Sequence, residues 1–335
     1  MDKRKLGKLE VSPIGMGCMG FSHGYGQVPE EQYSIDAIRK AYEYGCNFFD
    51  TAEAYGDVMF SEGHNELIVG KAVKDFRKDI VIATKYHLRP TDVVEGRTLY
   101  EIVRHHMEQS MKRLQTDHID LYYLHRVNES IPVEEVAEVM GQLIKDGDIS
   151  EWGLSQVSVE TLSKAHAVTP VATVQNLYSM LERGCEKEMF PYTLKNNIGI
   201  VPFSPIASGF LSGKITSKTV FEEKDDVRKY VPQLSKENIK GNQPIIEVLQ
   251  RFATAKSATN AQISLAWMLH KYPNVIPIPG SKNQERILEN LGAWNVSLTD
   301  HEFEALEKAL NSCTVFGYRG FVETEQTTFG NNWEK

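Results

Sequence analysis

The stretch that decides the fold is Asn47-Phe48-Phe49-Asp50-Thr51-Ala52-Glu53-Ala54-Tyr55-Gly56. It begins as a short apolar run, which is typical of a buried strand, and then becomes polar. Asp50 falls where the strand should end, and Tyr55 follows five residues later in the next loop. In a parallel α/β barrel the carboxyl ends of the strands carry the catalytic groups, so this carboxylate and phenol are candidates for chemistry. The alternative, from this stretch alone, is a strand-ending aspartate beside a half-buried tyrosine.

The composition is that of a soluble globular protein. The chain has 335 residues, of which 41% are hydrophobic and 24% charged, enough for one large domain or two ordinary ones. The formal net charge of -8 gives no general attraction to nucleic acid or to an anionic membrane. The four cysteines are far apart and match no metal-ligand pattern, and no apolar run reaches membrane length. We therefore expect a cytoplasmic protein with reduced thiols, without a signal peptide or membrane anchor.

Strands and helices alternate along nearly the whole chain. Residues 4–12 are typical of a β-hairpin that turns at Gly7-Lys8, and apolar strands separated by helical patterns follow. The expected strands are residues 14–19, 47–50, 80–84, 119–124, 149–154, 171–174, 198–203 and 275–278. The expected helices are residues 30–44, 62–73, 99–114, 133–145, 159–167, 186–196, 244–256, 260–270, 285–291 and 299–310. A Thr299-x-x-Glu302 capping box opens the last helix.

This alternation favours a closed barrel. Strands that alternate with helices form a parallel sheet, and eight such units over this length predict a (β/α)8 TIM barrel, here with an N-terminal β-hairpin. No change of composition marks a linker, so we predict a single domain over residues 1–335. A long polar segment at residues 205–241 interrupts the rhythm, and a loop of that length is usually functional or mobile. The alternative is a doubly wound sheet with a second domain after about residue 205.

Residues 15–20 match the pattern G-x-G-x-x-G literally. In the dinucleotide-binding fingerprint, the last glycine opens a helix whose N-terminus faces the pyrophosphate. Here the polar residues 21–27 intervene, and the next helix can begin only near Pro29-Glu30. We therefore interpret residues 15–20 as a tight turn after a strand and not as a Rossmann motif.

Four titratable side chains are expected at one rim of the barrel: Asp50, Tyr55, Lys85 and His125. Each alone has an ordinary explanation, as a solvated loop residue or a hydrogen-bonded strand end, but together they form a plausible proton relay. The usual tyrosine pKa of about 10 is too high for acid–base catalysis near neutrality, and a lysine ammonium nearby lowers it. Asp50 can hold Lys85 in place, and His125 can hydrogen-bond the phenol or a substrate carbonyl. This set is suited to reducing a carbonyl or oxidising an alcohol.

Further motifs follow at successive strand ends. In chain order they are Asp50-Thr51-Ala52 with Tyr55-Gly56, Lys85, Leu124-His125-Arg126, Gly153-Leu154-Ser155, Val174-Gln175-Asn176-Leu177-Tyr178-Ser179, Phe203-Ser204-Pro205, Ser208-Gly209-Phe210-Leu211-Ser212-Gly213, and Pro279-Gly280-Ser281-Lys282 with Glu289-Asn290. Each motif is moderately specific, and their order is highly specific. By them the sequence resembles the aldo-keto reductase family, from the hairpin to at least Ala293, and within it the broad-specificity branch of bacteria and plants.

The resemblance implies an enzyme that reduces an aldehyde or ketone to an alcohol by hydride transfer from NADPH, with NADH as a second option. It implies that Tyr55 is the proton donor, that Lys85 and Asp50 tune it, and that His125 orients the carbonyl. The implied partner is a small-molecule carbonyl compound, with no role for nucleic acid or membrane.

The resemblance also implies residues for the nicotinamide end of the cofactor. Ser155 and Gln175 are implied to hold the carboxamide, and Phe203 to stack on the ring, at a position where the family more often has tyrosine. One departure from the family pattern affects this end of the site. Gln156 stands where the family usually has asparagine, and its longer side chain puts a direct carboxamide contact in question.

The phosphate end is implied in the same way. Residues 204–213 are implied to follow the pyrophosphate, although Ala207-Ser208 replaces a basic residue found in some relatives. Ser281, Lys282 and Arg286 are implied to bind the adenosine 2′-phosphate through charge-assisted hydrogen bonds. The complete expected cofactor-binding set is Ser155, Gln175, Phe203, Ser204, Pro205, Gly209, Leu211, Gly213, Gly280, Ser281, Lys282, Arg286, Glu289 and Asn290.

Two other functions stay open. A Schiff-base aldolase with Lys85 as its nucleophile is one, but it leaves residues 204–213 and 279–290 without a role. The other is a nicotinamide-binding sensor or regulatory subunit, an idea weakened by the intact set of four titratable residues.

Substrate specificity is expected to come from loops over the rim, at residues 21–28, 86–97, 126–132 and 205–241, and from the tail after Cys313. Aromatic candidates for an apolar pocket, each also explicable as ordinary packing, are Tyr86, Tyr178, Phe210, Phe316, Tyr318 and Trp333. The histidines in helical patterns show no metal-ligand spacing, so we expect no metal; they are His64, His105, His106 and His270.

Overall fold

The core of the molecule is a parallel β-sheet that curls into a barrel. The computed structural model describes residues 2–57, 59–89, 92, 96–221 and 225–320. Within them each strand of the sheet pairs in parallel with the next one along the chain. The strands are β3 (Met16–Gly17), β4 (Phe48–Asp50), β5 (Val81–Tyr86), β6 (Ile119–Leu124), β7 (Ile149–Ser155), β8 (Thr173–Gln175) and β9 (Gly199–Ile200).

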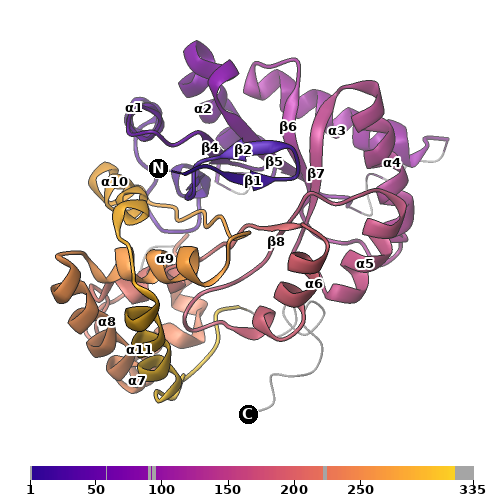
Figure 1. Cartoon of the computed structure of the whole chain (residues 1–335). Helices are drawn as coiled ribbons and strands as arrows, with labels where there is room; N and C mark the ends of the chain where they lie inside the picture. The colour runs from indigo at the N-terminus through magenta and orange to yellow at the C-terminus, as the bar shows by residue number, and fades with distance from the viewer. Residues whose placement is uncertain (1, 58, 90–91, 93–95, 222–224, 321–335) are drawn as a thin grey trace.

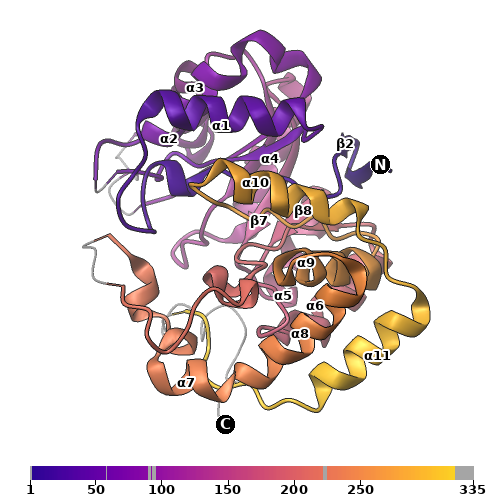
Figure 2. The same ribbon diagram turned by 90° about the vertical axis from the view of Figure 1, so that its left-hand side faces the viewer.

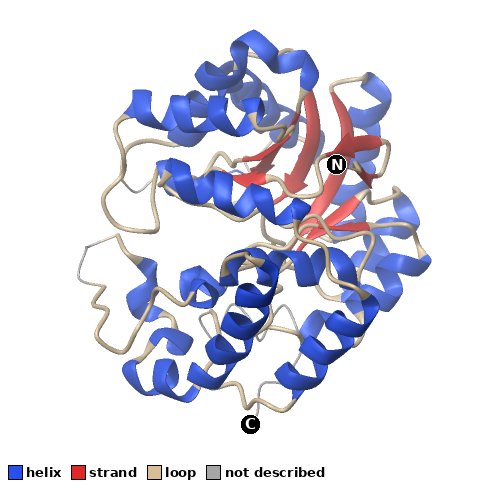
Figure 3. Cartoon of the chain, turned by 60° about the vertical axis from the view of Figure 1, so that its left-hand side comes forward, coloured by secondary structure: helices blue, strands red, loops and turns tan. Residues whose placement is uncertain are grey.

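Helices surround the strands (Figure 3). They are α1 (Glu31–Glu43), α2 (His64–Val73), α3 (Leu99–Leu114), α4 (Val133–Asp146), α5 (Val159–Val168), α6 (Met189–Lys195), α7 (Lys236–Gly241), α8 (Gln243–Lys256), α9 (Asn260–Lys271), α10 (Gln284–Leu291) and α11 (Asp300–Asn311). Helices α1, α10, α9, α8 and α11 follow one another on the outside, and neighbours in this series are in contact (Figure 2). The predicted capping box is confirmed, because the Thr299 hydroxyl accepts from the Glu302 N–H while the Glu302 carboxylate accepts from the Thr299 N–H.

The barrel is closed by residues 275–280. Parallel bridges join Val275 to Ile200 on one side and Gly280 to Gly17 on the other. The expected eighth strand is not a regular one, because Pro277 and Pro279 have no N–H to donate. The prediction of a (β/α)8 barrel is nevertheless confirmed, and the open doubly wound sheet is wrong because the first and last segments are joined.

Glycines make this closure possible. A Cβ atom on Gly17 would lie 2.8 Å from the carbonyl oxygen of Ile278, and one on Gly280 would lie 3.0 Å from the carbonyl oxygen of Gly17. Only a residue without a side chain fits where the two backbones approach so closely. The glycines of residues 15–20 therefore serve barrel closure. The Rossmann alternative is wrong, because a 3₁₀ turn (Met19–Phe21) follows β3 and the next helix begins only at Glu31.

The predicted hairpin is confirmed as β1 (Arg4–Leu6) and β2 (Leu9–Val11), which turn at a left-handed Gly7. It lies across the sheet in Figure 1. Leu6 and Val11 pack in one apolar cluster with inward-facing strand residues such as Phe48, Leu121 and Ile276. The hairpin thus closes the end of the barrel at which the strands begin, and the carboxyl ends remain open for a site.

The segment at residues 205–241 is more ordered than its composition suggests. Its described part holds three 3₁₀ turns (Ala207–Ser212, Val227–Tyr230 and Pro232–Leu234) and helix α7. Tyr25, in the loop after β3, forms an antiparallel bridge with Asp226, and the Gly24 N–H donates to the Asp225 carboxylate at 2.7 Å. Two loops that are distant in the sequence are therefore joined above the rim. In the described part of the chain, no helix combines the length and apolarity that crossing a membrane requires.

Replacing Gly17 by alanine should destabilise the barrel. The added Cβ would meet the Ile278 carbonyl oxygen at 2.8 Å, and neither backbone can move without disturbing the closure. We expect the free energy of unfolding in urea to fall by about 1–3 kcal/mol, the usual cost of overpacking. Gly20→Ala is the matched control, since its Cβ would meet the Lys282 side chain at an ordinary 3.4 Å. Equal losses in the two variants would refute the steric explanation.

Candidate active site

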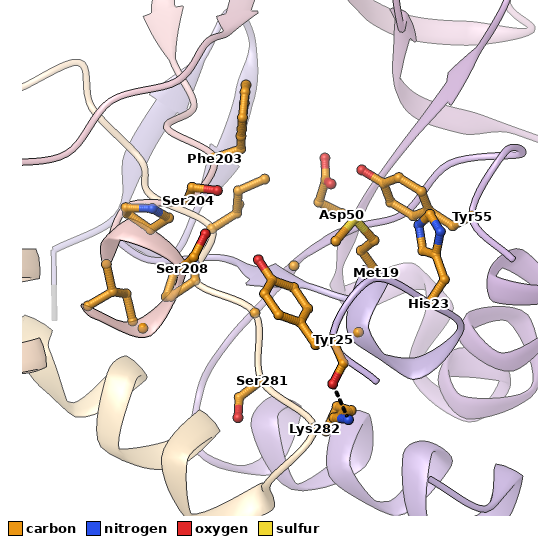
Figure 4. Close-up of a pocket in the computed structure, with 18 of the residues that line it drawn as sticks. Met19, His23, Tyr25, Asp50, Tyr55, Phe203, Ser204, Ser208, Ser281 and Lys282 are labelled. Atoms are coloured by element: carbon orange, nitrogen blue, oxygen red, sulfur yellow. Dashed lines mark hydrogen bonds between the residues drawn. The ribbon is translucent and has the colours of Figure 1, made fainter. Parts of the chain in front are cut away.

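The carboxyl ends of the strands surround a cavity of about 1110 Å³. In Figure 4, Asp50, Tyr55, Met19 and His23 lie along one side, while Phe203, Ser204 and Ser208 lie along the other. The predicted site residues that line the cavity are Asp50, Tyr55, His125, Ser155, Gln175, Phe203, Ser204, Pro205, Gly209, Gly280, Ser281, Lys282, Arg286, Glu289 and Asn290. The expected catalytic residues and the expected cofactor-binding residues therefore line one continuous cavity.

Lys85 lies behind the cavity wall and is completely buried. Its ammonium donates to the Asp50 carboxylate at 2.5 Å, to the Thr51 carbonyl oxygen at 2.8 Å and to the Tyr55 hydroxyl at 3.1 Å. These three acceptors match its three N–H bonds. Burial lowers the pKa of Lys85, but the Asp50 charge and the hydrogen bonds to Asp50 and Tyr55 outweigh burial and raise the pKa overall. Lys85 is therefore a fixed ammonium held against the phenol.

Asp50 connects this group to a third strand. Its second carboxylate oxygen accepts a hydrogen bond from the Gln175 amide at 2.8 Å, so the ends of β4, β5 and β8 are tied together. Burial raises the pKa of Asp50 above its usual value, and Lys85 and Gln175 act in the opposite direction. Sequence reasoning linked Gln175 only to the cofactor and missed its contact with Asp50.

The pKa of Tyr55 differs from the expectation. Burial raises it, and the nearby Lys85 charge lowers it by less, so the pKa ends above its ordinary value. The predicted effect of the Lys85 ammonium has the expected direction, but burial, which the sequence does not display, outweighs it. Tyr55 is therefore a neutral phenol near neutral pH, able to donate a proton.

Two more aromatic rings flank this phenol. The His125 ring lies edge-on to Tyr55 with 5.7 Å between ring centroids, and the His23 ring lies 5.5 Å away on a tilt. Burial, Arg126 and Lys85 hold the pKa of His125 well below its usual value, so the imidazole is neutral. Its Nδ1 is buried without a hydrogen-bond partner.

His87 extends the row of imidazoles. Its ring centroid lies 4.3 Å from that of His125, and burial and the Arg126 charge lower its pKa to about 4. Sequence reasoning did not single out His23 or His87. Both lie in loops expected to cover the rim, which was the available signal.

The other side of the cavity has an unusual backbone. Ser204, Ala207, Ser208 and Gly209 have φ values of 50°, 47°, 54° and 95°, in the left-handed region. Turns of this kind can present backbone N–H groups to an anion. Here the N–H groups of Ala207 and Gly209 already donate to the carbonyl oxygens of Ser204 and Ile206, at 2.9 and 3.0 Å. The Ser208 hydroxyl is buried without a partner, a second sign of a missing polar ligand. This segment fits a phosphate group.

Lys282 stands at the far end of the cavity. It donates to the carbonyl oxygens of Tyr25 at 2.7 Å and Gln27 at 2.6 Å, the first of which is drawn in Figure 4. The side chain of Tyr25 reaches into the cavity between the two walls. Lys282 therefore connects the closing segment of the barrel to the loop after β3.

Two of the predicted cofactor-binding residues do not line the cavity. Leu211 is completely buried in the main hydrophobic core, and Gly213 ends the 3₁₀ turn with a φ of 73°. The Leu211 N–H donates to the Ile206 carbonyl oxygen at 3.3 Å, and the Gly213 N–H donates to the Phe210 carbonyl oxygen at 3.0 Å, so both help to close this turn. Gln156 does line the cavity and has a φ of 59°, a conformation that asparagine adopts more easily than glutamine.

The aromatic residues expected from the sequence to form an apolar substrate pocket are not among the described residues that line the cavity. Tyr86, Tyr178 and Phe210 are completely buried, so their alternative as ordinary packing is confirmed. Phe316 packs at Gly241, Tyr318 does not line the cavity, and Trp333 lies outside the described residues. The aromatic side chains that do line the cavity are Tyr25, Tyr33, Tyr55 and Phe203.

A second buried network joins the loop that carries Tyr55 to helices α2 and α3. Glu53, in the loop after β4, accepts from the His87 N–H at 2.8 Å and faces His106 Nδ1 on α3 at 2.9 Å. Nearby, Glu66 accepts from Arg113 at 2.6 Å. This network fixes the backbone on either side of Tyr55. Among the described residues, no group of three or more histidine, cysteine or acidic side chains could hold a metal ion.

The sequence and structure can now be compared with those of known proteins. Residues 13–311 match the family model described as "Aldo/keto reductase family". The chain belongs to the aldo/keto reductase family. It is therefore an oxidoreductase, and the resemblance seen in the sequence is confirmed.

Two curated aldo/keto reductases are similar over nearly their full length. The chain is 38% identical over 322 residues to "Probable aldo-keto reductase 1" of Glycine max, covering 94% of this chain and 90% of that protein. It is 35% identical over 324 residues to "Aldo-keto reductase yakc [NADP(+)]" of Schizosaccharomyces pombe, covering 94% and 93%.

Solved structures of aldo/keto reductases share the fold. The glycerol dehydrogenase AKR11B4 of Gluconobacter oxydans has a TM-score of 0.82 at 27% identity, with 93% of this chain and 96% of that chain covered. An aldo/keto reductase of Klebsiella pneumoniae, solved in complex with NADP and acetate, has a TM-score of 0.72 at 25% identity, with 96% and 100% covered.

The pH dependence of stability should reveal the ion pair of His106 and Glu53. Burial lowers the pKa of His106, but the Glu53 hydrogen bond and charge outweigh it and raise the pKa above 6.5. The protonated imidazole therefore stabilises the fold fully below pH 6.5, and this contribution disappears as the pH rises through the raised value. We expect His106→Gln to lower the free energy of unfolding by about 1.5–3 kcal/mol at pH 5.5 and by less at pH 8.5. His105→Gln, at an exposed neighbouring position, is the control. A loss in His106→Gln that does not change with pH would argue against the ion pair.

Proposed function

We propose that this chain reduces an aldehyde or ketone to an alcohol with NADPH, and that Tyr55 donates the proton to the carbonyl oxygen. The observation that carries the proposal is the contact of 3.1 Å between the Tyr55 hydroxyl and the buried Lys85 ammonium, at the edge of the cavity. Membership of the family supports the reaction class, and the NADP(+) in the name of the fission yeast relative supports the cofactor.

Each side chain has a part in the proton transfer. The Tyr55 hydroxyl gives its proton to the oxygen that becomes the alcohol, and Lys85 stabilises the phenolate left behind. Asp50 keeps Lys85 charged and in place. Neutral His125 carries one N–H, which can donate to the carbonyl oxygen and orient it without competing as the acid.

The residues around the cavity fit a nicotinamide dinucleotide phosphate. When bound, NADPH supplies the hydride that reduces the carbonyl carbon. Ser155, Gln175 and Phe203 are proposed to hold its nicotinamide end, and the turn of residues 204–209, with its Ser208 hydroxyl, the pyrophosphate. Residues proposed for the adenosine end are Gly280, Ser281, Lys282, Arg286, Glu289 and Asn290. The buried, unpartnered Ser208 hydroxyl is the observation that fits a missing polar ligand at this place.

Two observations count against Lys85 as the nucleophile of an aldolase. A Schiff-base lysine needs a lowered pKa, whereas the Asp50 charge and the hydrogen bonds to Asp50 and Tyr55 raise the pKa of Lys85 above its usual value. All three of its N–H bonds also have acceptors, and the side chain does not line the cavity.

Replacing Tyr55 by phenylalanine tests the proton donor. We expect kcat for 4-nitrobenzaldehyde to fall by about 100-fold or more, since the acid is lost, while NADPH affinity changes little. Loss of nicotinamide absorbance measures turnover, and quenching of tryptophan fluorescence measures binding. Tyr42→Phe, at a tyrosine outside the cavity whose hydroxyl donates to Asp79, is the control. Full activity in Tyr55→Phe would refute this role, and a wild-type protein that binds NADPH without turnover would favour the sensor alternative.

The Lys85 and Asp50 pair can be tested by restoring charge balance. Lys85→Met alone leaves the buried Asp50 carboxylate without its cation, which should cost about 3–5 kcal/mol of stability in addition to activity. The double variant Lys85→Met with Asp50→Asn should recover most of the stability and none of the activity. Urea denaturation and aldehyde reduction measure the two effects. A double variant as active as the wild type would exclude the proposed relay.

A further inference from the structure

We propose that Arg126 is a substrate-binding residue, and that the preferred substrates are short aldehydes or ketones that carry a carboxylate close to the carbonyl group. This inference rests on the proposed function and names the substrate class of the same site. Arg126 directly follows His125 and lines the cavity.

The bonding of Arg126 leaves one edge of its guanidinium free. Its Nη1 donates to the His125 carbonyl oxygen at 2.5 Å and to the Ser155 hydroxyl at 3.1 Å. Its Nε and Nη2 have no hydrogen-bond partner among the described residues. Neither nitrogen belongs to the set of fully buried polar atoms, so both can be reached from the cavity. These two nitrogens form the planar fork that binds a carboxylate in a bidentate manner.

Arg126 also lacks a counter-ion. In the described part of the chain, no carboxylate lies within 4.0 Å of its guanidinium. Arg228, which lines the same cavity, is bound by Asp226. Burial lowers the pKa of Arg126, which means that the charged form is left partly uncompensated. A partly buried cation of this kind gains more from an anionic ligand than a solvated surface arginine does.

The position of Arg126 limits where the anionic group can lie. Arg126 follows His125 in the chain, its guanidinium donates to the His125 carbonyl oxygen, and both residues line the same cavity as Tyr55, so the guanidinium lies near the place where the carbonyl oxygen is expected. Its contact with Ser155 fixes the guanidinium between the ends of β6 and β7. A carboxylate on Arg126 therefore belongs to a short molecule, with few atoms between the carboxylate and the carbonyl.

A matched pair of substrates tests the inference. Succinic semialdehyde and its methyl ester have the same aldehyde, but only the first carries a carboxylate. We compare kcat/KM for the acid with kcat/KM for the ester and expect a ratio of at least about 10 in the wild type. In Arg126→Gln this ratio should fall about 10–100-fold, because a charged hydrogen bond to the acid is lost. The fall should come chiefly from a higher KM for the acid. Arg126→Lys should restore part of the ratio, because it keeps the charge and loses the fork. Arg39→Gln, at a surface arginine paired with Asp75, is the control and should keep the wild-type ratio.

Three results would overturn the inference. The first is a wild-type ratio near one. The second is an Arg126→Gln variant with an unchanged ratio and weaker NADPH binding, which would make Arg126 a cofactor-binding residue. The third is a ratio that depends on Arg319, which also lines the cavity and has a buried Nε without a partner, in place of Arg126; Arg319→Gln tests it.

Calorimetric titration with benzoate separates this inference from the proposed function. Benzoate carries a carboxylate and no reducible carbonyl, so its binding does not depend on turnover. We expect benzoate to bind the wild type, with and without NADP, and to bind Arg126→Gln at least about 10-fold more weakly. Equal binding to both proteins counts against Arg126. A wild type that reduces neither the acid nor the ester, yet binds benzoate through Arg126, would refute the reductase and retain the anion site.

Discussion

The buried ion pair of Lys85 and Asp50 organises the rest of the site. Removing an ammonium and a carboxylate from water costs free energy, and their mutual attraction offsets this cost only when further hydrogen bonds satisfy both groups. Lys85 also bonds the Thr51 carbonyl and the Tyr55 hydroxyl, and Asp50 also bonds Gln175. The pair therefore fixes three strand ends and one phenol in a single arrangement. The same arrangement keeps Lys85 charged and Tyr55 neutral.

The barrel supplies the positions that this ion pair requires. Parallel strands present their carboxyl ends to one face, and the hairpin closes the other end, so polar side chains gather where water and ligands can enter. The buried Glu53 carboxylate joins the loop that carries Tyr55 to the loop after β5, through the His87 N–H, and to His106 on α3. The strand ends and the Glu53 contacts together hold the side chains of the site in place.

Much of this fold and site could be predicted from the sequence, because the hydrophobic periodicity identifies strands and helices and their order along the chain identifies the barrel. Alternating strands and helices gave the barrel, and residues at strand ends gave the convergence of Asp50, Tyr55, Lys85 and His125. What depended on three-dimensional surroundings could not be predicted. The rise in the pKa of Tyr55 follows from burial, which the sequence does not display. Leu211 belongs to a motif, yet its apolar side chain is needed in the core. His23 and His87 come from loops, whose paths no periodicity determines.

The closing segment of the barrel has a mechanical consequence. Its two prolines leave few backbone hydrogen bonds to join it to its neighbours in the ring. In the described residues, the N–H groups of Gly15, Ile200, Ile276 and Ile278 donate to the carbonyl oxygens of Pro277, Asn274, Ile200 and Pro202. The seam where the ring closes is therefore held by a short hydrogen-bond ladder. The residues after the seam, from Gly280 on, share the cavity with strand ends such as Ser155 and Gln175 on the other side. A ligand that contacts residues on both sides of the seam links the first and last parts of the barrel, so ligand binding in the cavity should also stabilise the closed barrel.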